Sequence, residues 1–262
     1  MSSAQGQQHQ LAKKITKQLA KEKKLTFFCD FDGTLSDFVL NPEEATVPLS
    51  TIKNLATLSE HPLIDLIILS GRPLSFLQKR FPKSFKLAGE YGSKTNFTDN
   101  ELKKESLPDK TQAKLLELVK IHPHSHIEKK DHSWVWHYRR IKESLSEEKI
   151  QHLMTKLSQT LSHSSYSVYH YNCVLEIKRS DISKASFVQS HVQHNPDHIF
   201  IAFGDDIADQ SFFEMIPKNQ GWVCAVGDVI TKADYYFKAP ENLRSFILHL
   251  KEQLQMQEPL PC

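Results

Sequence analysis

The sequence has little of what marks a secreted, membrane-embedded or disulfide-stabilised protein. Only four of its 262 residues are cysteine, and Cys29, Cys173 and Cys224 lie in apolar, strand-like runs, which favours buried reduced thiols. Nowhere does the chain approach the roughly 18 consecutive apolar residues of a membrane span. The N-terminus has no continuous apolar stretch of the kind that a secretory signal requires. We therefore expect a cytoplasmic protein without a membrane partner.

The sequence also lacks a strong excess of charge, an internal repeat and a long low-complexity segment. Its formal net charge is +2, which is too small to indicate a nucleic-acid partner. Lysines are concentrated only in residues 1–24, where Leu11, Ile15 and Leu19 recur every fourth residue. This period predicts a basic amphipathic helix that packs on the body of the protein. Contact of this helix with an anionic partner or a membrane surface is the alternative.

Apolar runs of strand length alternate with stretches that have the period of a helix. The helix-period stretches begin near residues 49, 185 and 243, and the strand-like runs lead into polar or glycine-containing residues. This alternation predicts an α/β fold with a mainly parallel sheet that is covered on both faces. The predicted strands are residues 25–30, 64–70, 198–204 and 222–226.

The middle of the chain has a different pattern. Residues 95–178 read as helix, two strands, helix and two strands, which is not the alternation of a parallel sheet. We therefore predict an α+β module inserted into the α/β core. The predicted core comprises residues 25–94 and 179–262, and the predicted strand pairs of the insert are 125–130 with 134–138 and 166–170 with 174–178.

Acidic side chains follow the first predicted strand. In the stretch FFCDFDGTL, Asp30 ends the strand and Asp32 lies two residues further, so both side chains point to the same side in extended geometry. In an open α/β sheet, functional groups gather at the carboxyl ends of the strands. Two carboxylates there can hold a divalent cation, or one can attack phosphorus while the other handles the proton.

Three further groups of polar residues follow the same logic. The second strand leads into Ser70, Gly71 and Arg72, which offer a hydroxyl and a backbone N–H to a phosphate oxygen. Lys184 opens a predicted helix and brings a fixed positive charge. The third strand ends in GDDIAD, an oxygen-rich turn suited to Mg²⁺, with Asp205, Asp206 and Asp209.

This set of four motifs, DFDGT, SGR, Lys184 and GDDIAD, resembles the haloacid dehalogenase superfamily of phosphohydrolases. The resemblance covers nearly the whole chain after residue 25 and implies a Rossmann-like core with an inserted cap. It makes Asp30 the nucleophile that forms an aspartyl-phosphate and Asp32 the general acid and base. Mg²⁺ would be held by Asp30, the Asp32 backbone carbonyl and Asp205, while Lys184 and Ser70 offset the charge of the phosphate.

The resemblance also bears on two neighbouring carboxylates and on the type of reaction. Asp206 and Asp209 are expected to orient metal-bound water or Lys184 rather than to bind the ion. Family members that only pass through a phosphorylated state, such as transport ATPases, lack a carboxylate at the position of Asp32. Its presence here therefore favours a hydrolase.

The insert and the GEYGSK stretch indicate the leaving group. The stretch EKKDHSWVWHYRR, together with GEYGSK and LEIKR, resembles the trehalose-6-phosphate phosphatase family, in which these positions grip a disaccharide. Carboxylates accept hydrogen bonds from sugar hydroxyls, and Lys and Arg bind phosphate or ring oxygens. The alternative is a solvated sheet face whose packed side holds Trp134 and Trp136. The predicted sugar ligands are Glu90, Glu128, Lys130, His137, Arg139 and Glu176.

Some positions depart from the family pattern, and other functions stay open. Ala208 and Gln210 stand where the fourth motif usually has Thr and Glu, and Ala185 replaces a common Gly; we still expect activity because Asp209 is retained. A phosphatase of sucrose 6-phosphate or of a glycosyl-phosphoglycerate is the nearest alternative. A catalytically silent sugar-phosphate sensor is a further one, since such domains accompany some synthases. A trehalose-phosphate synthase is accordingly a candidate partner.

Overall fold

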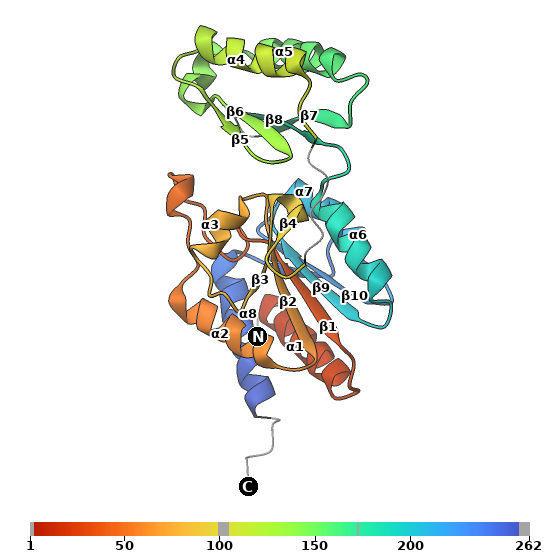
Figure 1. Cartoon of the computed structure of the whole chain (residues 1–262). Helices are drawn as coiled ribbons and strands as arrows, with labels where there is room; N and C mark the ends of the chain where they lie inside the picture. The colour runs from red at the N-terminus through yellow and green to blue at the C-terminus, as the bar shows by residue number, and fades with distance from the viewer. Residues whose placement is uncertain (1–2, 99–104, 172, 257–262) are drawn as a thin grey trace. The chain divides into compact units, whose positions relative to one another are not determined.

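The computed structural model describes residues 3–98, 105–171 and 173–256 (Figure 1). The chain divides into two compact units: the core, residues 1–99 with 184–262, and the cap, residues 100–183. These limits lie a few residues beyond those that the sequence predicts, 95 and 178. Thr95 pairs with Ala88 in the core sheet, and the last cap strand continues to Arg179. Residues 99–104 of the predicted insert, and Cys262, lie outside the described residues.

A seven-stranded sheet forms the centre of the core, which confirms the predicted α/β class (Figure 1). Its order is β11-β10-β9-β1-β2-β3-β4, and all pairs except β3–β4 are parallel. The four predicted strands are β1, β2, β9 and β10. The sequence did not predict three short strands, the edge strands β4 and β11 and the strand β3 beside β4. The strands are β1 Leu25–Cys29, β2 Ile64–Leu69, β3 Lys86–Gly89, β4 Lys94–Thr95, β9 Ile199–Gly204, β10 Gly221–Val226 and β11 Tyr235–Phe237.

Helices cover both faces of this sheet because its central strands are apolar on both sides. Along β1, Phe27 and Cys29 belong to one hydrophobic cluster with α1, α2 and α8, whereas Phe28 belongs to a second cluster with α6 and α7. This alternation follows from the two-residue period of a strand. The helices are α1 Ser3–Leu19, α2 Leu49–Glu60, α3 Leu74–Gln78, α6 Lys184–His194, α7 Ile207–Phe213 and α8 Pro240–Gln255, with short 3-10 turns η1 Pro42–Glu44 and η2 Glu90–Gly92.

The basic N-terminal helix is part of the hydrophobic core. Leu11 and Ile15 of α1 are fully buried and Leu19 nearly so, and α1 packs against α8 and β11. Lys14 reaches back over the rings of Trp222 and Tyr235, 5.7 and 5.4 Å from their centroids. The apolar side of α1 is therefore occupied by the core, which confirms the predicted packing of this helix on the body of the protein.

The cap is an antiparallel sheet of order β5-β6-β8-β7 backed by two helices. Trp136, Leu175 and Ile177 are fully buried and form one cluster with Leu115 and Leu157 of the helices. The sequence places the four strands within one residue at each end. The elements are α4 Asp109–Ile121, β5 His126–Lys129, β6 Ser133–His137, η3 Arg139–Ser144, α5 Glu147–Thr160, β7 Tyr166–Tyr171 and β8 Val174–Arg179. Among all described residues, no helix combines the length and apolar character that crossing a membrane requires.

Candidate active site

The strand register brings the four motifs to one edge of the core sheet. Cys29 of β1 lies opposite Ile68 of β2 and Phe203 of β9, so the residues that follow these strands leave the sheet at the same level. The backbone N–H of Asp30 donates to the carbonyl of Phe203, at 3.0 Å. Because β1 lies between β2 and β9, the first motif stands between the second and the fourth. The first and fourth motifs, which lie about 175 residues apart in the sequence, become neighbours in this way.

Lys184 connects three of the four motifs. Its Nζ atom lies 2.5 Å from Asp30 Oδ1 and 2.5 Å from Asp209 Oδ1, and all three side chains are buried. Burial alone would lower the pKa of Lys184, but Asp209 and Asp30 outweigh burial and raise it. The ammonium group therefore stays charged, and it holds the Asp30 carboxylate in a fixed position.

Asp209 is held on both of its oxygens. While Oδ1 binds Lys184, Oδ2 accepts the backbone N–H of Asp205 at 2.9 Å and that of Asp206 at 3.4 Å, and the second of these bonds belongs to a capping box at the start of α7. The Asp206 side chain completes this cap by accepting from the Asp209 backbone N–H at 3.1 Å. Asp209 thus fixes both Lys184 and the turn that carries Asp205.

Asp30, Asp205 and Asp209 form a buried carboxylate cluster whose oxygens lie within 4.8 Å of one another. Burial, and then the neighbouring Asp209 and Asp206, raise the pKa of Asp205 to about 7. Burial likewise raises the pKa of Asp30, despite the opposing effect of Lys184. So many carboxylates around one ammonium group favour a bound cation, and these oxygens could hold a metal ion. The cluster includes two of the predicted metal-ligand residues and the Asp209 carboxylate.

Thr34 is a site residue that the sequence reading left out. Its hydroxyl lies 3.2 Å from Asp30 Oδ2 and 3.3 Å from Asp205 Oδ1, and so joins the first and fourth motifs. The neighbouring Gly33 has a φ of +70°, and a Cβ atom there would collide with the Asp205 carboxylate. The signal for both residues was present in DFDGT, but spacing alone did not say which atoms the Thr hydroxyl would meet.

Asp32 and Arg72 form a bidentate ion pair. Arg72 Nε and Nη2 donate to the two carboxylate oxygens of Asp32, at 2.9 and 2.7 Å. The Asp32 side chain keeps about a third of its surface exposed, unlike that of Asp30. The Arg72 backbone N–H donates to the buried Ser70 hydroxyl at 3.1 Å. Arg72, predicted as a phosphate ligand beside Gly71, therefore engages the predicted general acid in this structure.

The predicted sugar ligands fall in both units. Glu90 lies in the core, buried in η2 with a φ of +50°, and Lys94 Nζ is 4.0 Å from its carboxylate. Lys130 lies in the turn between β5 and β6, where its backbone N–H donates to the carbonyl of Ser133. Arg139 begins η3, directly after β6 and Tyr138.

Glu128, Glu176 and His137 share one face of the cap sheet, which we call its polar face. Val135 of β6 pairs with Glu128 on one side and with Glu176 on the other, so these side chains point to the same face as Val135. His137 lies two residues after Val135 on the same strand and therefore points to this face as well. His137 Nε2 lies 3.0 Å from Glu128 Oε2, and its ring stacks on that of His126 at a centroid distance of 4.6 Å. The helices cover the opposite face, to which the buried Trp136 contributes.

Lys178 and Tyr169 extend this polar face, and the sequence reading did not single them out. Tyr169 pairs with Glu176 across β7 and β8, and Lys178 Nζ lies 4.7 Å from the centroid of the Tyr169 ring. The signal for Lys178 was its position two residues after Glu176 in LEIKR, which places both on the same side of a strand.

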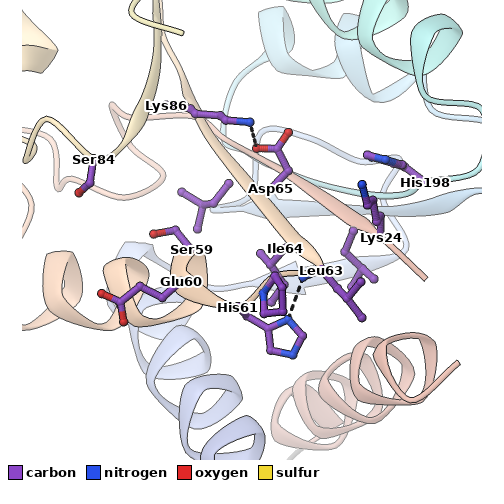
Figure 2. A pocket seen from close by; sticks show the side chains of 13 residues that line it. Lys24, Ser59, Glu60, His61, Leu63, Ile64, Asp65, Ser84, Lys86 and His198 are labelled. Carbon is purple, nitrogen blue, oxygen red and sulfur yellow. Dashed lines mark hydrogen bonds and ion pairs between the residues drawn. The ribbon is translucent and has the colours of Figure 1, made fainter. Parts of the chain in front are cut away.

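A separate cavity of about 350 Å³ lies at the opposite, amino-terminal ends of β1 and β2 (Figure 2). Lys24, His61 and His198 border it, and Lys86 pairs there with Asp65 at 2.7 Å. Its lining contains none of the motif residues. We assign the candidate active site to the carboxyl edge because the buried acid and base groups converge there.

Comparisons with known proteins agree with this geometry. A sequence model of the trehalose-phosphatase family matches residues 28–242. The chain is 27% identical over 247 residues to a bifunctional trehalose-6-phosphate synthase/phosphatase of Thermoproteus tenax, covering 91% of this chain and 33% of that protein. It is 24% identical over 241 residues to the trehalose-6-phosphate phosphatase of Escherichia coli, covering 89% of each.

The fold is also found among solved structures. The C-terminal domain of a Candida albicans trehalose-6-phosphate phosphatase superposes with a TM-score of 0.75 at 23% identity, covering 94% of this chain and 96% of that one. At this level of identity the likeness establishes the fold. The chain spans about a third of the length of the Thermoproteus tenax relative.

Proposed function

The chain belongs to the trehalose-phosphatase family, and on that premise we propose that it hydrolyses trehalose 6-phosphate to trehalose and phosphate. The observation that carries the proposal is the contact of Lys184 with Asp30 and Asp209 beside Asp205. A buried carboxylate held by a lysine is a nucleophile that is already oriented before substrate binds. Burial of this constellation would otherwise only cost free energy.

The first chemical step transfers the phosphoryl group to the enzyme. An Asp30 oxygen attacks phosphorus, the bond from phosphorus to the sugar oxygen breaks, and that oxygen leaves with the electron pair. Asp32 supplies the proton that the leaving oxygen takes up. Lys184, fixed by Asp209, and the Ser70 hydroxyl are placed to offset the negative charge of the phosphoryl group.

The second step is hydrolysis of the aspartyl-phosphate. Asp32 accepts a proton from water as the water oxygen attacks phosphorus, and the bond to Asp30 breaks to release phosphate. The bidentate pair with Arg72 orients the Asp32 carboxylate that takes up this proton.

The cation in this proposal is Mg²⁺. Asp30 and Asp205 fit it, because they are oxygen ligands in a cluster with an excess of negative charge. When bound, Mg²⁺ reduces the repulsion between the nucleophile and the phosphate dianion. We place Asp209 and Asp206 as the residues that orient Lys184 and the turn, and we include the Asp32 backbone carbonyl as a ligand.

The cap residues Glu128, His137 and Glu176 are proposed to bind sugar hydroxyls, together with Lys130, Arg139 and the core residue Glu90. This proposed role is supported by the two faces of the cap sheet, because one face carries these polar side chains and the helices cover the other, apolar face. Carboxylates spaced along such a face can each accept hydrogen bonds from neighbouring hydroxyls of one sugar. Relatives joined to a synthase, such as that of Thermoproteus tenax, make a trehalose-phosphate synthase a candidate partner.

The test is phosphate release from trehalose 6-phosphate beside sucrose 6-phosphate, a glucosyl-phosphoglycerate and acetyl phosphate, with Mg²⁺ and with chelator. We expect metal-dependent turnover with a preference for trehalose 6-phosphate, and a loss of at least about three orders of magnitude in Asp30→Asn. Preference for another sugar ester would reject the substrate but keep the mechanism. Absence of turnover with every ester, in a folded protein that binds trehalose 6-phosphate, would identify a sensor instead.

A further inference from the structure

The loop that follows the first motif exposes three consecutive apolar side chains. Phe38 is 78% exposed, and Val39 and Leu40 beside it are exposed as well. Consecutive exposed apolar side chains lower the solubility of a protein, and they commonly mark a contact surface. Of these three side chains, Phe38 is the one that GDDIAD and the Gly33 turn of the first motif meet, because its ring tip lies beside Gly33 and the Asp205 carboxylate.

The loop is anchored directly before Phe38. Both carboxylate oxygens of Asp37 accept hydrogen bonds from Arg244, each at 3.1 Å, and Arg244 also donates to the carbonyl of Leu35 at 3.2 Å. The Ser36 hydroxyl donates to the carbonyl of Phe31. The backbone up to residue 37 is therefore held by the body of the core, and this fixes the place from which the Phe38 ring extends.

The Phe38 ring reaches the edge of the carboxylate cluster. Its Cζ atom lies 2.5 Å from the point at which a Cβ atom on Gly33 would stand, and the Asp205 carboxylate approaches the same point. The ring tip and the carboxylate are thus neighbours above the Gly33 turn. A phenyl ring can neither transfer a proton nor bind the cation, so chemistry does not explain an exposed aromatic side chain at this place.

The geometry of phosphoryl transfer indicates what meets this ring. The leaving oxygen departs opposite the attacking Asp30 oxygen, so the leaving group lies outside the buried cluster. A sugar presents polar hydroxyls at its edge and apolar C–H groups on its faces. We propose that Phe38 packs against the C–H face of the leaving sugar and contributes to the preference for sugar phosphates, an inference that rests on the function proposed above.

The test measures the preference between leaving groups rather than the overall rate. In Phe38→Ala we expect kcat/KM for trehalose 6-phosphate to fall about tenfold, mainly through KM, with a much smaller loss on acetyl phosphate, which has no ring. Phe38→Trp should stay within about threefold of the wild type. Leu40→Ala, in the same loop, is the matched control and should retain the wild-type preference.

Binding provides a second readout. In an Asp30→Asn background, Phe38→Ala should weaken the calorimetric Kd for trehalose 6-phosphate about tenfold and leave that for inorganic phosphate nearly unchanged. Equal losses on both substrates, or on both ligands, would mean that Phe38 only supports the Gly33 turn, and no loss would also overturn the contact.

The experiment distinguishes an error in the proposed substrate from an error in the proposed Phe38 contact. If the wild type hydrolyses a different sugar phosphate, trehalose 6-phosphate is the wrong substrate, and the same variants decide the contact on the ester that is turned over. If no sugar phosphate is hydrolysed or bound, the contact is rejected as well.

Discussion

The core and the cap carry their candidate functional groups in different ways. In the core, the groups follow strand ends and are joined by buried charge contacts, as Lys184 joins Asp30 to Asp209. In the cap, they stand on the polar face of an antiparallel sheet, where Glu128 and His137 form a pair that is about a third exposed. A buried network permits one arrangement only, whereas a partly exposed pair such as Glu128 and His137 tolerates substitutions and can adapt to a ligand. Glu176, on the same face, is buried. We expect chemistry to depend on the buried network of the core and substrate choice on the polar face of the cap.

The strongest test of this contrast is Lys184→Met. It removes the ammonium group between two buried carboxylates, so we expect kcat to fall by at least about a thousandfold and the free energy of unfolding to fall by about 3–5 kcal/mol. Steady-state kinetics and urea unfolding measure the two effects. The exposed Lys218→Ala is the control and should change neither. Activity within tenfold of the wild type would show that the network is only structural.

The stability of the cap should also be separable from that of the core. Leu157→Ala creates a cavity in the cap cluster, and we expect it to lower the stability of the cap by about 2–5 kcal/mol. Hydrolysis of acetyl phosphate should persist under conditions in which the cap is unfolded, because its chemistry uses core residues. Hydrogen exchange resolved by segment, read beside that activity, tests this. Leu116→Ala, on the exposed side of α4, is the control. Simultaneous loss of protection in both units would contradict independent stability.

Substitution on the polar face should change specificity without changing the chemistry. For Glu128→Gln we expect KM for trehalose 6-phosphate to rise about tenfold or more, since a neutral amide replaces a charged hydrogen-bond acceptor. The value of kcat/KM for acetyl phosphate should change little. Glu143→Gln, an exposed carboxylate of η3, serves as the comparison. An equal loss of kcat/KM with trehalose 6-phosphate and with acetyl phosphate would contradict the role of this face in sugar recognition.

The smallest expected effect is a pH dependence in the cap. The hydrogen bonds from Arg179 hold the pKa of Asp181 below its usual value, which is near 4. Because the folded-state pKa is the lower one, this pair stabilises the protein above about pH 4, and the stabilisation is lost as pH falls through that range. Asp181 is more than half exposed, so we expect less than about 1 kcal/mol. Unfolding of wild type and Asp181→Asn should differ near pH 6 and converge near pH 3; a constant difference would contradict the linkage.

The central strands and the motifs were predictable because their signals are local. A buried strand such as β1 needs apolar residues on both sides, and a carboxylate directly after it lies at the sheet edge. The short strands β3, β4 and β11 escaped prediction because two to four residues carry too little periodicity. Thr34 and the Asp32–Arg72 pair escaped because side-chain contacts between distant motifs depend on register.

The sequence by itself determined the fold class, the order of the four motifs and the residue types that bring acid, base and phosphate-binding groups together. Hydrophobic periodicity and turn chemistry are properties of neighbouring residues, so they can be read along the chain. Only the tertiary structure decided that Asp209 holds Lys184 and the Asp205 turn, that Arg72 engages Asp32, and that Phe38 lies above Gly33. These contacts join residues from separate strands and helices, and their geometry exists only once the sheet has set the register.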